Sequence, residues 1–341
     1  MGQEAWRGAR HQSGRMQARL FAASMMALIA GQARAAGFRH ITIPDPGNPP
    51  IEANIWYPSS TAPRPNALGL QTQVVAADAA VAGTGLGLIA VAHGTGGNAN
   101  NHFDTGIALA DAGFVVVAPT FTGDSTQDRS RALMIWNRPR LLHVVLDYML
   151  ATWPDHARID PHRVGAFGFS AGGFTVLVAA GGTPDMSTVA PHCKAHPEEW
   201  TCTMIARFHT QNDHPTPLPA SIWVHDSRIR AAVVAAPALG YAFGKAGLSG
   251  VHVPVQLWRA EDDRILPTPF YTEPVAADLP MKPDYHVVAK ADHLDFLSPC
   301  SAALTQAVPG VCLTEPGFSR AAFHADFDKA VVAFFRNNLP S

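Results

Sequence analysis

The stretch VGAFGFSAGG, residues 164–173, joins a short apolar run to a Gly-x-Ser-x-Gly motif with Ser170 at its centre. The apolar run predicts a buried strand, and the apolar residues after Gly173 predict a buried helix. A strand that turns directly into a helix crowds the backbone at the apex, and Gly168 and Gly172 lack the Cβ atoms that would clash there. The stretch therefore predicts a nucleophile elbow, with the Ser170 hydroxyl at a helix N-terminus above the carboxyl end of a sheet. The alternative is a small-residue turn between strand and helix that carries no chemistry.

Short apolar runs alternate with helical patterns along the rest of the chain. The expected strands cover residues 38–43, 51–57, 88–92, 114–119, 163–169, 229–236, 253–259 and 284–289. The expected helices cover residues 101–112, 139–152, 174–180 and 319–337. This alternation is typical of an α/β fold with a mostly parallel central sheet and helices on both faces. The first two strands are expected to pair antiparallel at an edge, whereas the Pro-, Ala- and Gly-rich residues 59–86 give no clear pattern.

The composition is that of a globular enzyme with a large core, since 47% of the 341 residues are hydrophobic and 15% are charged. The formal net charge is −2 and the basic residues do not cluster, which argues against nucleic acid and anionic membranes as partners. No apolar run reaches the length of a membrane span, so we expect no stable membrane insertion. These observations favour one α/β domain over residues 36–341 and leave the oligomeric state open.

The N-terminal residues have the pattern of an export signal. Two arginines precede the apolar run 20–30, and a small-x-small cleavage site, Ala-Arg-Ala, follows at residues 33–35. We therefore expect residues 1–35 to be a signal peptide and the mature protein to be periplasmic or secreted. The alternative is an N-terminal amphipathic helix. No twin-arginine pair precedes the run, which suggests export of an unfolded chain without a cofactor loaded beforehand.

The four cysteines fall into two close pairs, Cys193 with Cys202 and Cys300 with Cys312, each in Pro-rich and loop-like sequence. In an oxidising compartment two local disulfides are the simplest interpretation, although two other connectivities are formally possible. A zinc site is the rival, but no C-x-x-C pair supports it. The first pair lies in the segment 181–221, which breaks the strand–helix rhythm and reads as a long loop. We expect this segment to be a cap-like insertion over the site.

A serine hydroxyl needs a base within hydrogen-bond reach and a carboxylate that orients the base. In sheets of this kind the three side chains follow in the order serine, acid, histidine, each after a later strand. After the strand 253–259 the Asp-x-x-x-Pro spacing selects Asp263 as the acid over its neighbour Asp262. After the last expected strand, His293 stands where the base should be.

An oxyanion hole needs two backbone N–H groups aimed at the developing negative charge. One is expected from Ala171, directly after the nucleophile, and the other from the loop after the first central parallel strand. That loop is His-Gly-Thr-Gly-Gly at residues 93–97, and Thr95 is the expected second donor. The rival interpretation of this loop is phosphate binding, but it lacks both the Gly-x-Gly-x-x-Gly pattern and a P-loop lysine.

Together these residues resemble the α/β-hydrolase superfamily over roughly residues 38–338. Within it, the chain is most similar to exported bacterial proteins grouped with dienelactone hydrolases and platelet-activating factor acetylhydrolases. The resemblance rests on the loop 93–97, the elbow at Ser170, the Asp263 turn and the residues that follow His293. It implies hydrolysis of a small-molecule ester by a Ser-His-Asp triad through an acyl-enzyme, and neither a cofactor nor a metal is expected.

Two departures limit what the resemblance implies about substrate. Dienelactone hydrolases proper use a cysteine nucleophile, and acetylhydrolases place the acid after the strand that follows the elbow, where this chain has none. Two rival functions remain open from the sequence. One is amide or peptide hydrolysis by the same triad, and the other is a non-catalytic binding protein on a hydrolase scaffold.

Overall fold

The computed structural model describes residues 35–208 and 218–341. The signal peptide expected over residues 1–35 therefore lies, except for its last residue, outside the described residues. Within the described part of the chain, no helix combines the length and the apolar character needed to cross a membrane.

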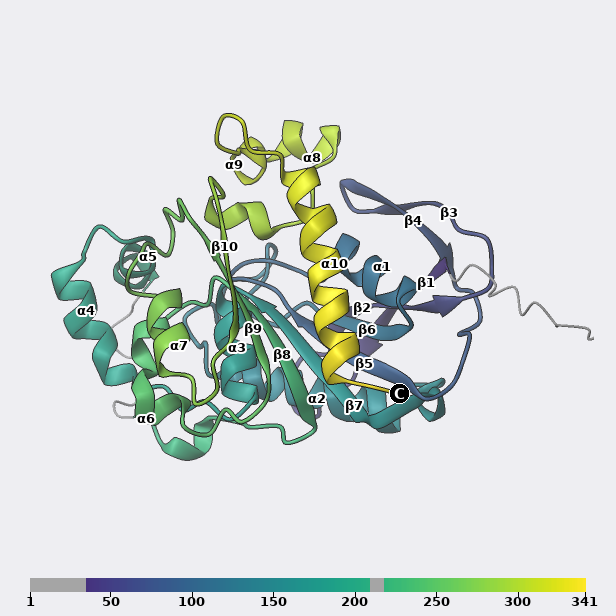
Figure 1. The fold of residues 1–341 in the computed structure, drawn as a ribbon, viewed down its shortest axis with the longest axis horizontal. Helices are drawn as coiled ribbons and strands as arrows, with labels where there is room; N and C mark the ends of the chain where they lie inside the picture. Colours follow the sequence, from purple (N-terminus) through teal and green to yellow (C-terminus); the bar gives the residue numbers. More distant parts are fainter. Residues whose placement is uncertain (1–34, 209–217) are drawn as a thin grey trace, which may run out of the picture. The chain divides into compact units, whose positions relative to one another are not determined.

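The described residues form one ten-stranded sheet in the order β10-β9-β8-β7-β5-β6-β2-β1-β4-β3 (Figure 1). The strands are β1 (Ala35–Ile43), β2 (Ile51–Ser59), β3 (Arg64–Leu68), β4 (Gln71–Ala77), β5 (Leu86–Ala92), β6 (Phe114–Pro119), β7 (Ile159–Phe169), β8 (Ile229–Ala235), β9 (Val255–Ala260) and β10 (Asp284–Val288). The six strands from β10 to β6 pair in parallel, which confirms the mostly parallel sheet. Strands β5 and β6 are apolar and wholly buried, as expected of the centre of a parallel sheet covered on both faces.

The mixed part of the sheet lies on the far side of β6, and within it β1 pairs in parallel with β4. Strand β1 pairs antiparallel with β2, as the sequence predicts, and β2 joins the parallel strands by pairing antiparallel with β6. Residues 59–86, which gave no pattern, contain the hairpin of β3 and β4. Its turn is made possible by Gly69, whose φ of 62° is one that glycine adopts without a Cβ penalty.

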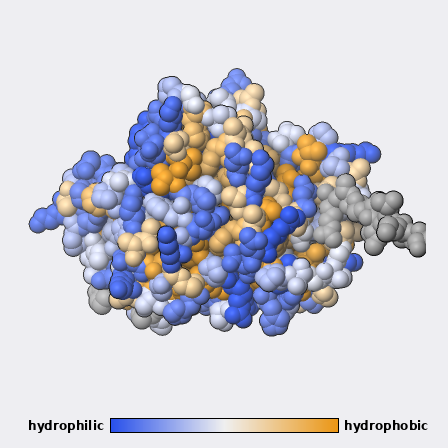
Figure 2. Space-filling model, viewed as in Figure 1, coloured by the Kyte–Doolittle hydropathy of each residue, from blue (hydrophilic) through white to orange (hydrophobic). Residues whose placement is uncertain are grey.

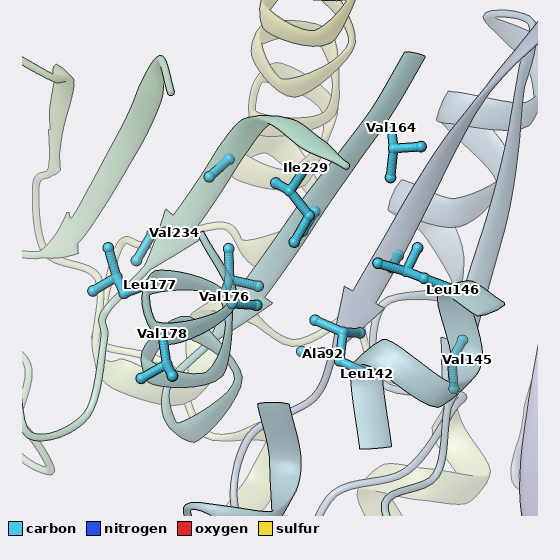
Figure 3. Packing of buried hydrophobic residues seen from close by; sticks show 14 of the residues in the cluster. Ala92, Leu142, Val145, Leu146, Val164, Val176, Leu177, Val178, Ile229 and Val234 are labelled. Atoms are coloured by element: carbon cyan, nitrogen blue, oxygen red, sulfur yellow. The ribbon is translucent and has the colours of Figure 1, made fainter. Parts of the chain in front are cut away.

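Helices cover both faces of the sheet, as expected. They are α1 (Phe103–Asp111), α2 (Asn137–Ala151), α3 (Ala171–Ala179), α4 (Val189–Ala195), α5 (Trp200–Phe208), α6 (Gly244–Leu248), α7 (Thr272–Asp278), α8 (Ala302–Ala307), α9 (Pro309–Cys312) and α10 (Arg320–Asn338). One core joins α2 and α3 to the sheet through side chains such as Leu142, Val176 and Val234 (Figure 3). The second core joins α1 and α10 to the other face.

Helix α10 crosses the second face and ends the described chain (Figure 1). The Ser319 hydroxyl caps its first turn by accepting from the Ala322 N–H at 3.3 Å. Its buried side chains, among them Phe327, Val331 and Phe335, recur at helical spacing and face the sheet. The face of the molecule seen in this view mixes hydrophilic and hydrophobic residues (Figure 2).

Both expected disulfides are present, Cys193–Cys202 and Cys300–Cys312. The first joins α4 to α5 inside the segment 181–221. The described residues 181–208 of this segment are largely helical rather than the long loop that their sequence suggested. The short link between the two helices is closed by the disulfide, which limits the freedom of the unfolded chain there.

Candidate active site

The Gly-x-Ser-x-Gly motif forms a sharp turn from β7 into α3. Ser170 sits at the apex with φ 57° and ψ −121°, a backbone conformation that L-residues rarely adopt. The two glycines are required by close approach: a Cβ at Gly172 would lie 1.9 Å from the Ala92 carbonyl oxygen, and one at Gly168 would lie 2.1 Å from the Gly172 oxygen. The Ser170 N–H donates to the Ala235 carbonyl of β8 at 2.9 Å, which fixes the apex to the neighbouring strand.

The structure brings the imidazole of His293 between two side chains that are far apart in sequence. Its Nε2 lies 3.0 Å from Ser170 Oγ, and its Nδ1 lies 2.7 Å from Asp263 Oδ2. Because the carboxylate accepts, the Nδ1 atom carries the proton and Nε2 is left to accept from the serine hydroxyl. All three residues are buried, with exposures of 8%, 2% and 7% for Ser170, His293 and Asp263. We call these three residues the elbow cluster.

Asp263 and its neighbour Asp262 make different contacts, and these decide which of them lies against His293. Asp263 Oδ1 accepts the backbone N–H groups of Ile265 at 3.0 Å and Leu266 at 2.7 Å, so that Oδ2 alone is turned to the imidazole. Asp262 is exposed, and its backbone N–H bonds the Ala291 carbonyl. The structure therefore places Asp263, and not Asp262, against His293.

The two expected oxyanion donors lie in segments next to Ser170. Ala171 is the first residue of α3, where the N–H groups of the first turn have no partner within the helix. The loop 93–97 also approaches Ser170, since a Cβ built on Gly94 would lie 3.2 Å from the Ser170 Cβ. Thr95, half-buried, is the next residue of this loop.

A buried arginine of α2 holds the loop 93–97 in place. Arg138 donates to Asp124 Oδ2 at 2.8 Å and to the carbonyl oxygens of His93 and Gly94 at 2.7 and 3.1 Å. The other Asp124 oxygen accepts from the Gly96 N–H at 2.7 Å. Both charged side chains are fully enclosed, and their mutual pairing compensates for the loss of hydration. Sequence analysis missed this pair, because an arginine in an amphipathic helix normally faces water.

His93 is a second fixed point of the same loop. Its Nδ1 lies 2.7 Å from the Gly94 carbonyl oxygen, and its Nε2 accepts from the Phe121 N–H at 3.0 Å. Burial, and then the charge of Arg138, hold the pKa of His93 well below its ordinary value. The ring is therefore neutral, and both of its nitrogens are committed to the backbone.

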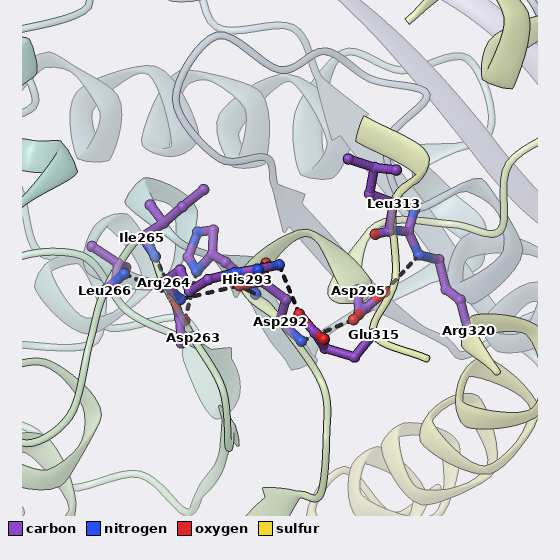
Figure 4. A network of polar contacts seen from close by, with 10 residues as sticks. All are labelled: Asp263, Arg264, Ile265, Leu266, Asp292, His293, Asp295, Leu313, Glu315 and Arg320. Carbon is purple, nitrogen blue, oxygen red and sulfur yellow. Dashed lines mark hydrogen bonds and ion pairs between the residues drawn. The ribbon is translucent and has the colours of Figure 1, made fainter. Parts of the chain in front are cut away.

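A polar network holds the short helix η5 (His293–Phe296), which carries the imidazole (Figure 4). Asp292 accepts the His293 N–H at 2.7 Å and pairs with Arg264. The buried Asp295 accepts the Asp292 N–H at 2.8 Å and pairs with Arg320 of α10 at 3.1 Å. The backbone of the imidazole-bearing turn is thus tied to the C-terminal helix.

A second group of polar side chains lies between α1 and α10, and we call it the helix cluster: Asp104, His324, Asp328 and Ser298. His324 Nδ1 lies 2.7 Å from Asp104 Oδ2, and the Ser298 hydroxyl donates to Asp104 Oδ1. Burial and the nearby Asp104 carboxylate raise the pKa of Asp328 to about 7. This cluster was not among the residues that the sequence singled out.

We call the segment 181–221 the excursion. Two of its residues, His192 and Glu199, contact loops that follow β8 and β9. Glu199 accepts from the Tyr271 hydroxyl and lies 2.9 Å from His192 Nε2. The ring of His192 stacks on Tyr241, with centroids 3.8 Å apart. Because these loops leave the carboxyl edge of the sheet, the excursion is anchored on the same side as the elbow.

One comparison with known proteins finds a match to a family. Residues 74–229 match the dienelactone hydrolase family. The matched segment includes the loop 93–97 and the elbow at Ser170, and it ends before Asp263 and His293. No curated protein matches the chain significantly. The matched family supports hydrolysis as the class of activity. The central segment of the chain is therefore similar to the dienelactone hydrolase family, and the mostly parallel sheet with helices on both faces is that of an α/β-hydrolase fold.

Proposed function

We propose that the protein is a serine hydrolase that cleaves carboxylic esters. One observation carries the proposal: the His293 imidazole stands between the Ser170 hydroxyl and the Asp263 carboxylate, at 3.0 and 2.7 Å. This is the arrangement in which a base can take the proton from a serine while a carboxylate stabilises the imidazolium that forms. The match to a hydrolase family supports the same class of reaction.

In the proposed mechanism Ser170 Oγ attacks the ester carbonyl while its proton passes to His293 Nε2. Asp263 keeps the ring in the required tautomer. The N–H groups of Ala171 and Thr95 stabilise the tetrahedral oxyanion. The intermediate collapses when His293 gives the proton to the leaving alcohol, and an acyl-enzyme remains. Water, activated by the same imidazole, then releases the acid and restores the hydroxyl.

The remaining expectations extend this proposal. Residues 36–341 form the hydrolase domain, and the disulfide-joined excursion within 181–221 acts as a cap on the side of the elbow. The two disulfides support export to an oxidising compartment, where residues 1–35 would act as the signal peptide. The partner is a small-molecule ester, and the chemistry uses side chains, backbone N–H groups and water.

A test combines turnover with labelling. We expect the protein to hydrolyse p-nitrophenyl esters from acetate to octanoate, and to hydrolyse the matching p-nitroanilides far more slowly. A phosphonate probe should add one equivalent, located on Ser170 by peptide mass spectrometry. Ser249→Ala, a substitution at an exposed serine, should label normally, whereas Ser170→Ala should not.

Other outcomes would replace the proposal. Comparable rates on esters and anilides would identify an amidase. Absence of both turnover and labelling, in a protein that folds normally, would favour a non-catalytic binding protein. Labelling at another serine would show that the nucleophile is not at the elbow.

A further inference from the structure

We propose that the helix cluster binds a divalent transition metal ion, with Zn²⁺ as the best fit. The ligands would be His324 Nδ1 and one carboxylate oxygen each from Asp104 and Asp328. One ligand atom from each of these residues lies within 4.8 Å of the other two. The site is separate from the elbow cluster and does not depend on the proposed function.

The positions of the three ligands follow from two packed helices. His324 and Asp328 are four residues apart on α10, so they project from the same face of the helix. Asp104 lies in the first turn of α1, which packs against α10. Both elements belong to the buried core on this face of the sheet, so the ligands stand on rigid supports.

The imidazole of His324 turns its Nδ1 atom toward the other members of the cluster. Its Nε2 donates to the Asp295 carbonyl oxygen at 2.9 Å, so Nδ1 is the nitrogen that faces Asp104, and a metal ion bound there would replace the proton that Nδ1 carries in the ion pair. His324 is 2% exposed, and its Nδ1 makes no aligned hydrogen bond although it lies 2.7 Å from Asp104 Oδ2. A metal-bound histidine in proteins commonly donates its second N–H to a carbonyl in this way.

Each carboxylate is likewise oriented by one of its oxygens. The Ser298 hydroxyl donates to Asp104 Oδ1, and the Thr105 hydroxyl donates to Asp328 Oδ1 at 2.7 Å. The second oxygen of Asp104 faces His324 Nδ1 at 2.7 Å, which is the place where an ion would bind. Support of this kind, in which an outer hydrogen bond fixes each ligand, is what metal sites require for a defined geometry.

The charge of the cluster also favours a cation. Once a metal ion has displaced the protons of the cluster, a neutral imidazole and two ionised carboxylates carry two negative charges in a largely buried space. Over residues 35–208 and 218–341, the ion pair of this cluster is His324 with Asp104 and involves no lysine or arginine. A divalent ion would balance both charges, and the 20% exposure of the Asp104 side chain gives it a path from solvent.

The ligand set selects among metals. One imidazole nitrogen and two carboxylate oxygens, with the remaining positions left to water, suit Zn²⁺ or Mn²⁺ better than Ca²⁺ or Mg²⁺, which prefer oxygen ligands alone. Of these two, Zn²⁺ binds more tightly to a given site in the general order of affinities. A second group of His, Glu and Cys in the excursion, His192, Glu199 and Cys202, lacks a usable thiolate because Cys202 is in a disulfide.

The ion would reinforce the turn that carries His293. The Asp295 carbonyl accepts from His324, and the Ser298 hydroxyl serves Asp104, so both ends of the segment 295–298 touch the ligands. Metal binding would therefore stabilise the position of the His293 imidazole. This consequence, unlike the site itself, rests on the proposed function.

The experiment measures binding rather than turnover. The purified full-length protein is treated with EDTA, and Zn²⁺ is then titrated into it by calorimetry, with Mn²⁺ and Ca²⁺ as comparisons. We expect one equivalent of Zn²⁺ to bind, Mn²⁺ to bind more weakly, and Ca²⁺ to bind weakest. At a concentration about 100 times Kd, Zn²⁺ should raise Tm by roughly 5 °C.

Variants locate the site. His324→Gln and Asp328→Asn should each weaken Zn²⁺ binding by more than about 100-fold, and Thr105→Val by roughly 10-fold to 100-fold. His192→Gln is the matched control and should bind as the wild type does. Zn²⁺ binding that survives in both helix-cluster variants, or is lost in the control, would overturn the assignment. So would an absence of binding at millimolar Zn²⁺ in protein whose Tm shows it to be folded.

The same titration on Ser170→Ala separates the two proposals. Full binding by this variant, together with loss of ester hydrolysis, would support both. Zn²⁺ binding by a wild type that hydrolyses no ester would leave the metal site standing and remove the proposed function.

Discussion

The elbow cluster and the helix cluster both contain a serine, a histidine and an aspartate, but the three are joined in a different order. In the elbow cluster the imidazole stands between the hydroxyl and the carboxylate. In the helix cluster a carboxylate stands between the hydroxyl and the imidazole, and the far ring nitrogen donates to a main-chain carbonyl. Only the first order lets an imidazole take a proton from a hydroxyl. The order of contacts, rather than the kinds of side chain, is therefore the basis for the different roles that we propose for the two clusters.

The sharpest way to break this comparison is to remove the serine of each cluster. Ser170→Ala should lower kcat for p-nitrophenyl esters by roughly 10⁴–10⁶, because the nucleophile is lost. Ser298→Ala should lower kcat by less than about 10-fold, because that hydroxyl serves a carboxylate outside the reaction. Steady-state kinetics of both variants measures the two losses in kcat. Equal losses would mean that the two clusters do not differ in role as their geometry indicates.

The next test concerns the carboxylate of the elbow cluster. Asp263→Asn should lower kcat by about 10⁴, because the amide can no longer hold the imidazole in the tautomer that accepts from Ser170. Asp262→Asn should change kcat by less than about 2-fold, since that side chain is exposed. Steady-state kinetics of the two variants at the same pH measures both changes in kcat. A large loss in the second variant and none in the first would reverse the assignment of the acid.

A third test asks whether the elbow cluster depends on its buried support. Arg138→Met should reduce the free energy of unfolding by about 3–5 kcal/mol, because it leaves Asp124 charged and unpaired in the core. It should also lower kcat by about 10²–10³, because the loop with the Thr95 donor loses its anchor. Arg140→Met, two residues further along α2, is the control. Its pair with Asp45 is partly exposed on the arginine side, so we expect a loss of about 1 kcal/mol.

Denaturant unfolding of both arginine variants, beside their kinetics, measures the two effects. Similar destabilisation by both substitutions would show that burial of the Arg138 pair does not set its importance.

The smallest effect is a pH dependence of stability that comes from the elbow side of the molecule. The folded state holds His93 neutral, whereas the unfolded state takes up a proton on this residue below about pH 6.5. Acidification below that pH therefore favours unfolding of the wild type. We expect His93→Gln to remove about 1.4 kcal/mol per pH unit from this dependence. Urea unfolding of both proteins between pH 7 and 5 checks it, and parallel curves would exclude a neutral buried His93.

The parallel half of the fold and the order of the elbow cluster were readable in the sequence. Central strands such as Phe114–Pro119 are continuous apolar runs, and the glycines beside Ser170 mark a turn that few other structures need. The hairpin of β3 and β4 was not readable, because one of its faces is exposed and its short strands contain proline and polar residues. The helices α4 and α5 were not predicted, because the prolines around them indicated a loop.

The residues that hold the candidate site in position could not be predicted from the sequence either. Arg138 and Asp124 look like ordinary surface charges, and only tertiary packing encloses them together. Asp292 and Asp295 flank His293, and no pattern in the sequence distinguishes them, although in the structure each one anchors the turn. The helix cluster needs contact between α1 and α10, which are more than 200 residues apart. Pairings over such distances leave no periodic signal along the chain.

The tie between Asp295 and Arg320 bears on when the elbow cluster can form. Helix α10 follows Ser170, Asp263 and His293 in the sequence, so Arg320 is synthesised after all three. Until α10 packs against the sheet, the turn with His293 lacks the anchor that Arg320 supplies through Asp295. We therefore expect the imidazole to take its place beside Ser170 only after α10 has docked.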